Sequence, residues 1–385
     1  MLPIASFNIS CPTLVRFGAG VSADLASLLP AGARRVTLIR GAGGIPAKPV
    51  REQLRQLNLT ITEVSCGAEP SVKSINDLLD GMEPQASDVV IACGGGAVID
   101  TGKAIAFCMA HGLRLTDDFS EVSVDLLAQP CPIPLIVLPT TAGTGAEVTS
   151  NAVLDVPSRR AKISLRGRAL FPHAALVDPS LMSGAPAPVV LNSGLDAITQ
   201  IIEAYTSVAA TAFSDALTAP NLERGLYALR GVVDRDCPNA MTNMAWISLA
   251  SGLALANSGL GAAHGLASVV GARYAAPHGA LCGLFLIPVL RQNRANADTG
   301  SEVERRLAIC CAAIASVFPP KDGKDDLSGL DDWLQSQRLP RLADFTATYD
   351  DFDGLADQAL LASSSQKNAV ALEKTHFIKI LEDAL

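Results

Sequence analysis

Several common features are scarce in this 385-residue chain, and each shortage excludes a class of protein. Lysine and arginine number 30 against 38 acidic residues, a net charge of -8, so no basic surface is available for nucleic acid. The nine cysteines include no CxxC pair, which fits reduced thiols and excludes a zinc site of the usual thiolate spacing. No uninterrupted apolar stretch reaches the ~20 residues of a membrane span, and the N-terminus lacks the pattern of a signal peptide. We therefore predict a cytoplasmic protein that binds neither nucleic acid nor membranes.

Aromatic residues are also few, at 4%, whereas 49% of the residues are hydrophobic and the mean hydropathy is +0.30. The cores must therefore be built from alanine, valine, leucine and isoleucine. Such an apolar chain predicts large cores extended by a subunit interface, so we expect a homodimer or a larger homo-oligomer. A length of 385 residues suits about two domains.

The first half of the chain alternates short apolar runs with helical patterns. Strands are predicted at residues 35–40, 59–64, 88–93 and 134–139, and helices at 50–57, 74–82 and 98–110. This alternation predicts an α/β domain with a parallel sheet and helices on both faces. Strand patterns nearly cease after the APAP segment at 185–188, so we place an α/β nucleotide-binding domain at 1–186 and an all-helical domain at 187–385.

Two loops that follow predicted strands have the composition of a nucleotide site. Gly94-Gly95-Gly96 lies between a strand and a helix, where backbone N–H groups and the helix dipole favour an anion. It differs from the GxGxxG fingerprint, and a plain tight turn explains it as well. The segment PTTAGTGAEVTS at 139–150 is more distinctive, because its hydroxyls can bind a nucleotide that its glycines allow to lie close.

The run 244–290 contains one formally charged residue, Arg273, and two of the five histidines, His264 and His278. A helix that is apolar on all sides must be buried, so these imidazoles are expected in a dry interior. An unpaired buried polar group costs roughly 2–7 kcal/mol, and the two histidines therefore need partners.

Candidate partners lie on a predicted helix that follows Ser193. Ser193 is expected to cap this helix, which places Asp196 at the third helical position. Asp196 and Gln200 are four residues apart and share a face. An Asp, Gln, His, His set suits a divalent transition ion such as Fe(II) or Zn(II). The alternative is a capping aspartate with two histidines that only pack.

These motifs resemble those of the iron-containing (group III) alcohol dehydrogenases, and the resemblance covers nearly the whole chain. The shared segments are GGGAVIDTGKA at 94–104, PTTAGTGAEVT at 139–149, VDPSLM at 177–182, GLDAITQIIEAYTS at 194–207 and AHGLASVVGARYAAPHG at 263–279. The resemblance implies a dinucleotide-binding α/β domain and an all-helical domain, with coenzyme and a divalent ion in the cleft between them.

The resemblance also implies roles for individual residues. Gly95, Gly96 and Ala97 would hold the coenzyme diphosphate, and Asp100 and Lys103 would lie near the nicotinamide. The other positions that line the nucleotide site would be Thr140, Thr141, Thr144, Asn151 and Lys162. The four metal ligands of the family correspond to Asp196, Gln200, His264 and His278.

Three departures from the family pattern affect these expectations. Gln200 and Ser268 stand where the family usually has histidines, which weakens the metal site or changes the ion it selects. The proton path must then be rerouted, and Ser268 is a candidate for it. The coenzyme is expected to be NAD or NADP. Arg40-Gly41 replaces the acidic residue that binds the ribose diol in many NAD-preferring members, which favours NADP(H).

We therefore predict hydride transfer between NAD(P)(H) and a small alcohol or carbonyl compound, assisted by a divalent metal. One alternative is a metal-free oxo-acid reductase similar to the maleylacetate reductases, in which Arg273 would reach the substrate. Another is a non-catalytic nucleotide-binding protein whose site has decayed. The lyase chemistry of the related dehydroquinate synthases needs a cationic cleft, which the run 244–290 does not supply.

Overall fold

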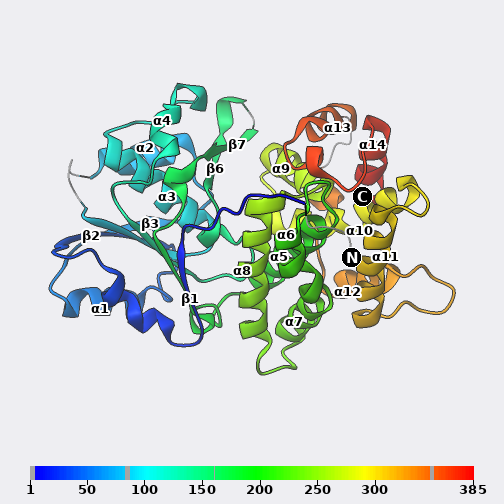
Figure 1. Ribbon diagram of the computed structural model, residues 1–385, viewed down its shortest axis with the longest axis horizontal. Coiled ribbons are helices and arrows are strands. Elements are labelled where there is room, and N and C mark those ends of the chain that lie inside the picture. Colours follow the sequence, from blue (N-terminus) through cyan, green and yellow to red (C-terminus); the bar gives the residue numbers. More distant parts are fainter. Residues whose placement is uncertain (1–4, 83–86, 160, 347–350) are drawn as a thin grey trace. The chain divides into compact units, whose positions relative to one another are not determined.

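The computed structural model describes residues 5–82, 87–159, 161–346 and 351–385, which cluster into two compact units (Figure 1). One unit comprises residues 11–186. The other comprises residues 187–385 together with residues 5–10 of the N-terminal segment.

The first unit contains a six-stranded sheet in the order β1-β8-β5-β4-β2-β3, and every strand pair is parallel. The strands are β1 (Leu14–Phe17), β2 (Arg35–Gly41), β3 (Thr60–Cys66), β4 (Val89–Gly94), β5 (Leu135–Pro139) and β8 (Ala174–Val177). A separate antiparallel hairpin consists of β6 (Asn151–Val156) and β7 (Ala161–Arg166). The predicted parallel sheet is confirmed, and each of the four predicted strands begins within one residue and ends within two residues of an observed one.

Strands β4 and β5 are buried along their whole length, so their sequences VVIACG and LIVLP show no alternation of polar and apolar residues. This is the pattern of a strand covered on both faces. The helices of this unit are α1 (Lys48–Gln56), α2 (Val72–Asp80), α3 (Gly96–His111) and α4 (Val124–Ala128). Helix α3 packs against β4, β5 and the hairpin strand β6.

The order of the strands creates a switch point between β2 and β4. From β2 the chain moves outward to β3, and it then returns to the other side of β2 to form β4. In open parallel sheets, ligands bind at the carboxyl ends of the strands beside such a point. Strand β2 ends there at Gly41, and the loop that follows β4 begins there with Gly95.

The second unit is helical, and its described residues contain no strand. Its helices are α5 (Ala187–Thr206), α6 (Ala212–Thr218), α7 (Leu222–Asp234), α8 (Ala240–Ser258), α9 (Ala262–Tyr274), α10 (His278–Asn296), α11 (Glu302–Val317), α12 (Ser328–Ser336), α13 (Phe352–Leu361) and α14 (Lys374–Asp383). Helix α5 packs against α7, α8 and α10, and α10 also packs against α9 (Figure 1). The helical architecture agrees with the prediction.

One helix boundary was predicted wrongly. Helix α5 begins at Ala187, with Pro188 in its first turn, rather than after Ser193. Ser193 lies inside the helix and donates its hydroxyl to the carbonyl of Val190 at 3.3 Å, so it is not a cap. Asp196 consequently lies in the third turn and is buried, which removes the interpretation of this carboxylate as a capping group.

The apolar run 244–290 forms most of α8, α9 and α10. Within the described part of the chain, no helix alone meets the length and hydropathy of a membrane span. Helices α8 and α9 meet them only as a pair, across a bend of 99°.

Candidate metal centre

The close packing of α10 on α5 brings the first donor groups together. A Cβ atom added to Gly279 would lie 2.1 Å from the carbonyl oxygen of Asn192, and one added to Gly283 would lie 2.6 Å from Leu195. These two glycines, four residues apart, therefore let the helix backbones approach more closely than any side chain would permit. The approach places His278, the first residue of α10, beside Asp196 in the third turn of α5.

Four ligand atoms converge at this contact, one each from Asp196, His264, His278 and Cys282, and all lie within 4.8 Å of one another. Asp196 Oδ1 is 3.1 Å from His264 Nε2 and 4.0 Å from His278 Nε2. Cys282 Sγ is 3.5 Å from His278 Nε2. Ligands around a tetrahedral ion with bonds of 2.0–2.3 Å are about 3.3–3.6 Å apart. The 3.1 and 3.5 Å separations are close to this range, and the pairs that are 4.0 Å or more apart would move closer around an ion.

Glu203 orients the histidine of α9. Its Oε2 atom lies 2.6 Å from His264 Nδ1, which leaves His264 Nε2 directed toward Asp196. Its Oε1 atom accepts the N–H of Ala263 at 2.7 Å, so the same carboxylate also binds the N-terminus of α9. A carboxylate that receives the second N–H of a ligating histidine fixes its tautomer and raises its basicity. Glu203 is therefore placed to support His264 as a metal ligand.

Burial and the neighbouring groups shift the pKa values of this cluster in opposite directions. Burial alone lowers the pKa of His264, but electrostatic interactions with Cys282 and Glu203 and the hydrogen bond to Asp196 raise it well above its ordinary value. Burial also raises the pKa of Asp196, yet the hydrogen bond to His264 and the charge on His278 bring it below its ordinary value. The cluster therefore favours positive charge, carried by protons on the imidazoles or by a cation among the four donors.

The predicted interior position holds for one histidine only. His264 is 4% exposed, whereas 30% of the His278 side chain is accessible. His264 lies in the interior as expected, whereas His278, the first residue of α10, is half-buried.

Gln200 lies next to this cluster, and both polar atoms of its side-chain amide form hydrogen bonds. Its Nε2 atom donates to Asp196 Oδ1 at 3.2 Å, and its Oε1 atom accepts the hydroxyl of Ser251 at 2.7 Å. A carboxylate can only accept hydrogen bonds, so the amide nitrogen is the atom that must face Asp196. Gln200 as a direct metal ligand stays a prediction.

Sequence reasoning missed Cys282 and Glu203. Cys282 follows His278 by four residues and Glu203 follows Asp196 by seven, so each shares a helix face with a recognised candidate. The spacing from Asp196 and His278 was the signal in the sequence that could have identified both residues. The sequence prediction considered the cysteines only for the spacing between one cysteine and another.

The two predicted nucleotide loops also meet, at the ends of the neighbouring strands β4 and β5. A Cβ added to Gly95 would lie 3.1 Å from Thr141 Oγ1, and one added to Gly96 would lie 2.6 Å from Thr144 Cγ2. Gly95 is the N-cap residue of α3, so the free N–H groups of this helix begin at the same place. Glycine backbone, threonine hydroxyls and a helix N-terminus together form a surface suited to a diphosphate.

Two family models match the chain over almost its full length. "Iron-containing alcohol dehydrogenase" matches residues 12–179, and "Fe-containing alcohol dehydrogenase family, C-terminal" matches residues 190–385. The chain belongs to the iron-containing alcohol dehydrogenase family. It is therefore an NAD(P)-dependent oxidoreductase of alcohols and aldehydes, with Asp196, His264 and His278 as its candidate metal site.

Known proteins of this family are similar in sequence and in fold. Alcohol dehydrogenase 4 of Schizosaccharomyces pombe is 29% identical over 386 residues, covering 97% of this chain and 87% of that protein. The 1,3-propanediol dehydrogenase of Citrobacter freundii is 34% identical over 244 residues, 62% of each chain. The iron-containing alcohol dehydrogenase structure from Thermococcus thioreducens superposes with a TM-score of 0.81 at 24% identity, covering 98% of this chain and 99% of that one.

The side chain of Lys103 is buried in the unit that contains the sheet and is hydrogen-bonded there. Its Nζ atom donates to Thr149 Oγ1 at 3.0 Å and to the carbonyl of Asn151 at 2.8 Å, and it lies 3.7 Å from Asp100. Asp100 accepts the N–H of Val153 at 3.1 Å. These contacts join α3 to the start of the β6 hairpin. A position near the nicotinamide stays a prediction for Asp100 and Lys103.

The remaining predicted coenzyme residues lie on the hairpin and at the end of β2. Asn151 donates its amide to Ser164 Oγ at 3.0 Å, and Lys162 pairs with Glu69. Arg40 forms an ion pair with Glu63 and donates to the carbonyl of Gly41 at 3.0 Å. The Arg40 guanidinium is therefore attached to the loop that begins at the switch point of the sheet.

Two residues from the mechanistic hypotheses lie on α9. Ser268 is half-buried, one helical turn beyond His264 and on the same face. Arg273 is in the last turn, where its Nη2 atom pairs with Asp351 at 2.9 Å and 36% of the side chain is exposed. A paired, accessible arginine is poorly suited to bind an oxo-acid substrate, so Arg273 does not favour the metal-free alternative.

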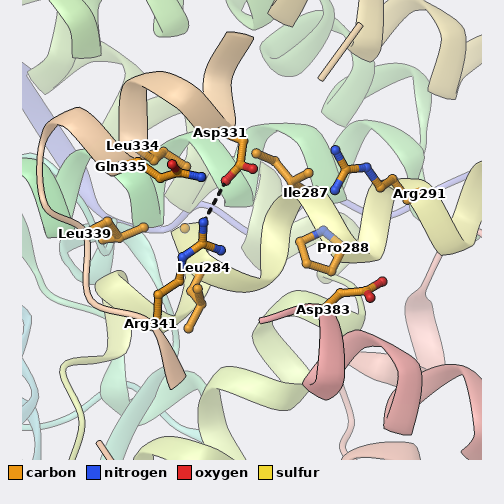
Figure 2. Close-up of a pocket in the computed structure, with 11 residues that line it drawn as sticks. Leu284, Ile287, Pro288, Arg291, Asp331, Leu334, Gln335, Leu339, Arg341 and Asp383 are labelled. Atoms are coloured by element: carbon orange, nitrogen blue, oxygen red, sulfur yellow. Dashed lines mark hydrogen bonds and ion pairs between the residues drawn. The ribbon is translucent and has the colours of Figure 1, made fainter. Parts of the chain in front are cut away.

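Figure 2 shows a separate pocket of the helical unit, lined by residues of α10 and α12 and by Asp383 of α14. Arg341 and Asp331 form an ion pair of 3.4 Å across it. A further lining residue, Arg291, pairs with Asp325 at 2.9 Å. None of the four metal donors lines this pocket, so it is distinct from the candidate metal centre.

Glu147 gives the dehydrogenase a testable pH dependence. Burial raises the pKa of this carboxyl from its ordinary 4.5 to about 7, although nearby Lys103 lowers it. The folded state then binds the proton more tightly, so this stability is complete below pH 4.5 and is lost as the pH rises through about 7. The loss amounts to about 3 kcal/mol at 1.36 kcal/mol per pKa unit.

We expect Glu147→Gln to remove most of the loss of stability that accompanies a rise in pH, because glutamine stays neutral. Chemical denaturation at pH 5 and pH 8 measures the free energy of unfolding of the wild type and of Glu147→Gln. Glu52→Gln, on the exposed face of α1, is the control. The variant should lose about 2–3 kcal/mol less than the wild type between these pH values. An unchanged pH dependence in Glu147→Gln would refute the assignment.

Proposed function

We propose that this dehydrogenase interconverts a small uncharged alcohol and its aldehyde or ketone with NADP(H), using a divalent ion bound by Asp196, His264 and His278. The observation that carries the proposal is the convergence of these donors within 4.8 Å, with Glu203 orienting His264. A decayed site would have no reason to retain a donor set of this spacing together with its supporting carboxylate.

When bound, the ion would act as a Lewis acid that stabilises negative charge developing on the substrate oxygen. The residues of the chain prepare for this. Asp196 contributes negative charge that holds a cation, and Glu203 accepts the Nδ1–H of His264, so that Nε2 is the nitrogen that would bind the ion in place of its proton. Ser268, one turn beyond His264, is the proposed group for moving the alcohol proton in place of the family's histidine.

The coenzyme is proposed to lie across the switch point, with its diphosphate on Gly95, Gly96 and Ala97. The hydroxyls of Thr140, Thr141 and Thr144 then line the nucleotide, together with Asn151 and Lys162. The N-terminus of α3 supports this placement, because its free N–H groups favour an anion.

NADP(H) is proposed as the preferred coenzyme because β2 ends in Arg40 and Gly41 without an acidic residue. The Arg40 guanidinium can attract a 2′-phosphate, and it is anchored there by Glu63 and the Gly41 carbonyl. Glu63 partly neutralises Arg40, so we expect a preference for NADPH rather than exclusion of NADH.

The proposed substrate class follows from the apolar surroundings of the site. The run 244–290, which forms most of α8, α9 and α10, carries one formal charge, on Arg273, and that guanidinium pairs with Asp351. Such surroundings suit a small neutral molecule and disfavour an acid. The names of the similar enzymes from S. pombe and C. freundii, an alcohol dehydrogenase and a 1,3-propanediol dehydrogenase, are consistent with this class.

The test measures turnover of short-chain alcohols and aldehydes before and after removal of metal by a chelator. We expect turnover to fall by at least 100-fold on chelation and to return when Zn(II) or Fe(II) is added, since the ion supplies several kcal/mol of stabilisation. In the same assay kcat/KM should be higher with NADPH than with NADH. Full activity of a protein shown to be metal-free would overturn the metal-dependent function.

A further inference from the structure

We propose that the thiolate of Cys282 is the fourth protein ligand of the metal ion, in the role that a histidine at position 200 has in the family. The donor set is then one carboxylate, two imidazoles and one thiolate. This inference deepens the proposed function, because it concerns the same site and names the donor that completes it.

The geometry of α10 carries the first step. Cys282 is four positions after His278 in one helix, so both side chains lie on the same face. Cys282 Sγ lies 3.5 Å from His278 Nε2, close to the nitrogen–sulfur separation of about 3.5 Å around a tetrahedral zinc ion. The sulfur is also within 4.8 Å of the ligand atoms of Asp196 and His264.

The close contact between helices fixes this placement. Gly279 and Gly283 allow α10 to lie directly on α5, and both immediately follow a donor residue, His278 and Cys282. A larger residue at either glycine would push α10 away and separate the sulfur from Asp196. The helix contact that brings His278 to the site therefore brings Cys282 with it.

Gln200 occupies a different role. Its carbonyl oxygen, the only amide atom able to ligate a cation, accepts the Ser251 hydroxyl at 2.7 Å. Its Nε2 atom donates to Asp196 Oδ1. Gln200 thus orients the Asp196 carboxylate, and the donor missing at position 200 is supplied by the sulfur at position 282.

The chemistry of a thiolate sets the class of ion. A thiol that binds a metal loses its proton to solvent, and the resulting thiolate suits borderline-soft ions such as Zn(II) and Co(II). With two imidazoles and one carboxylate, the set resembles a zinc site rather than the oxygen-rich sites of Mg(II) or Ca(II). We therefore expect zinc in the native protein.

The first experiment loads the whole protein with Co(II) and records its near-ultraviolet absorption, in which a cobalt–thiolate bond gives an intense charge-transfer band. The band should be present in the wild type and in Gln200→Ala, and absent in Cys282→Ser. Cys310→Ser, which changes another buried cysteine of the helical unit, is the matched control and should keep the band. Circular dichroism confirms that each variant is folded.

Zinc affinity in a chelator-buffered titration should fall by about 100-fold or more in Cys282→Ser, the upper end of what loss of a supporting group costs. X-ray absorption of the zinc-loaded wild type needs no variant, and it should show one sulfur at about 2.3 Å. Absence of that sulfur, or a cobalt band that persists in Cys282→Ser, would overturn the proposal.

These results separate the inference from the proposed function. A protein that turns over alcohols with metal but shows no sulfur ligand refutes Cys282 alone. A protein that binds zinc through sulfur but oxidises no alcohol refutes the proposed function and leaves the donor set standing.

Discussion

Asp196→Asn is expected to reduce the turnover of alcohols by about 1,000-fold and to leave the purified protein nearly free of metal. Asparagine has the same shape, so the packing of α5 against α10 is retained. The change removes the only carboxylate among the four candidate donors, and with it a negative charge that attracts a cation. Loss of the Lewis acid removes several kcal/mol of stabilisation, and each 1.36 kcal/mol corresponds to a factor of ten.

The measurement is kcat/KM for an alcohol together with metal content by mass spectrometry. Asp215→Asn is the matched control, since Asp215 pairs with Arg306 in the helical unit and forms no ion pair with a candidate metal donor. It should retain metal and turnover even if its Tm falls. Normal metal content and turnover in Asp196→Asn would show that the cluster is not the site of the chemistry.

Lys103→Met is expected to destabilise the protein by about 3–5 kcal/mol, the range observed when one partner of a buried charged group is removed. The Lys103 side chain is fully buried, and methionine fills a similar volume. The substitution deprives Thr149 Oγ1 and the carbonyl of Asn151 of their donor. It also leaves the carboxylate of Asp100 without its neighbouring positive charge.

Chemical denaturation at pH 7 measures this effect, with Lys73→Met as the control. Lys73 is 81% exposed and forms only a surface ion pair with Asp77, so its loss should leave stability close to that of the wild type. Adding Asp100→Asn to Lys103→Met should recover part of the lost stability, because it removes the unpaired charge. Equal stability of the two lysine variants would contradict a structural role for Lys103.

Much of the fold could be predicted because the central strands are continuous apolar runs that alternate with helical segments, and because such strand patterns nearly cease in the second half of the chain. The strands that were missed are β1 and β8, with four residues each, and the hairpin β6–β7. Four residues are too few for a pattern to stand out from loop sequence. Pairing with β5 and with each other defines β8 and β1 as strands, and such pairing is not visible along the chain.

The metal centre was predicted in part. Asp196, His264 and His278 could be identified because each lies in a segment similar to a known family. Cys282 and Glu203 share helix faces with His278 and Asp196, but that spacing alone does not show which neighbouring helices they contact, so they were not identified. The error at Ser193 has the same origin, since the sequence pattern indicated a plausible cap where the helix in fact continues.

The sequence by itself determined the resemblance to the family, the parallel sheet and the helical half, and it predicted three candidate metal donors, because these depend on local periodicity and on motifs read along the chain. Only the tertiary structure decided which atoms meet. The contact between α5 and α10 through Gly279 brings Cys282 to the donors, and Glu203 reaches across to α9. Residues 196, 264 and 282 are brought together by helix packing, which depends on the shapes of three separate segments and not on any one of them.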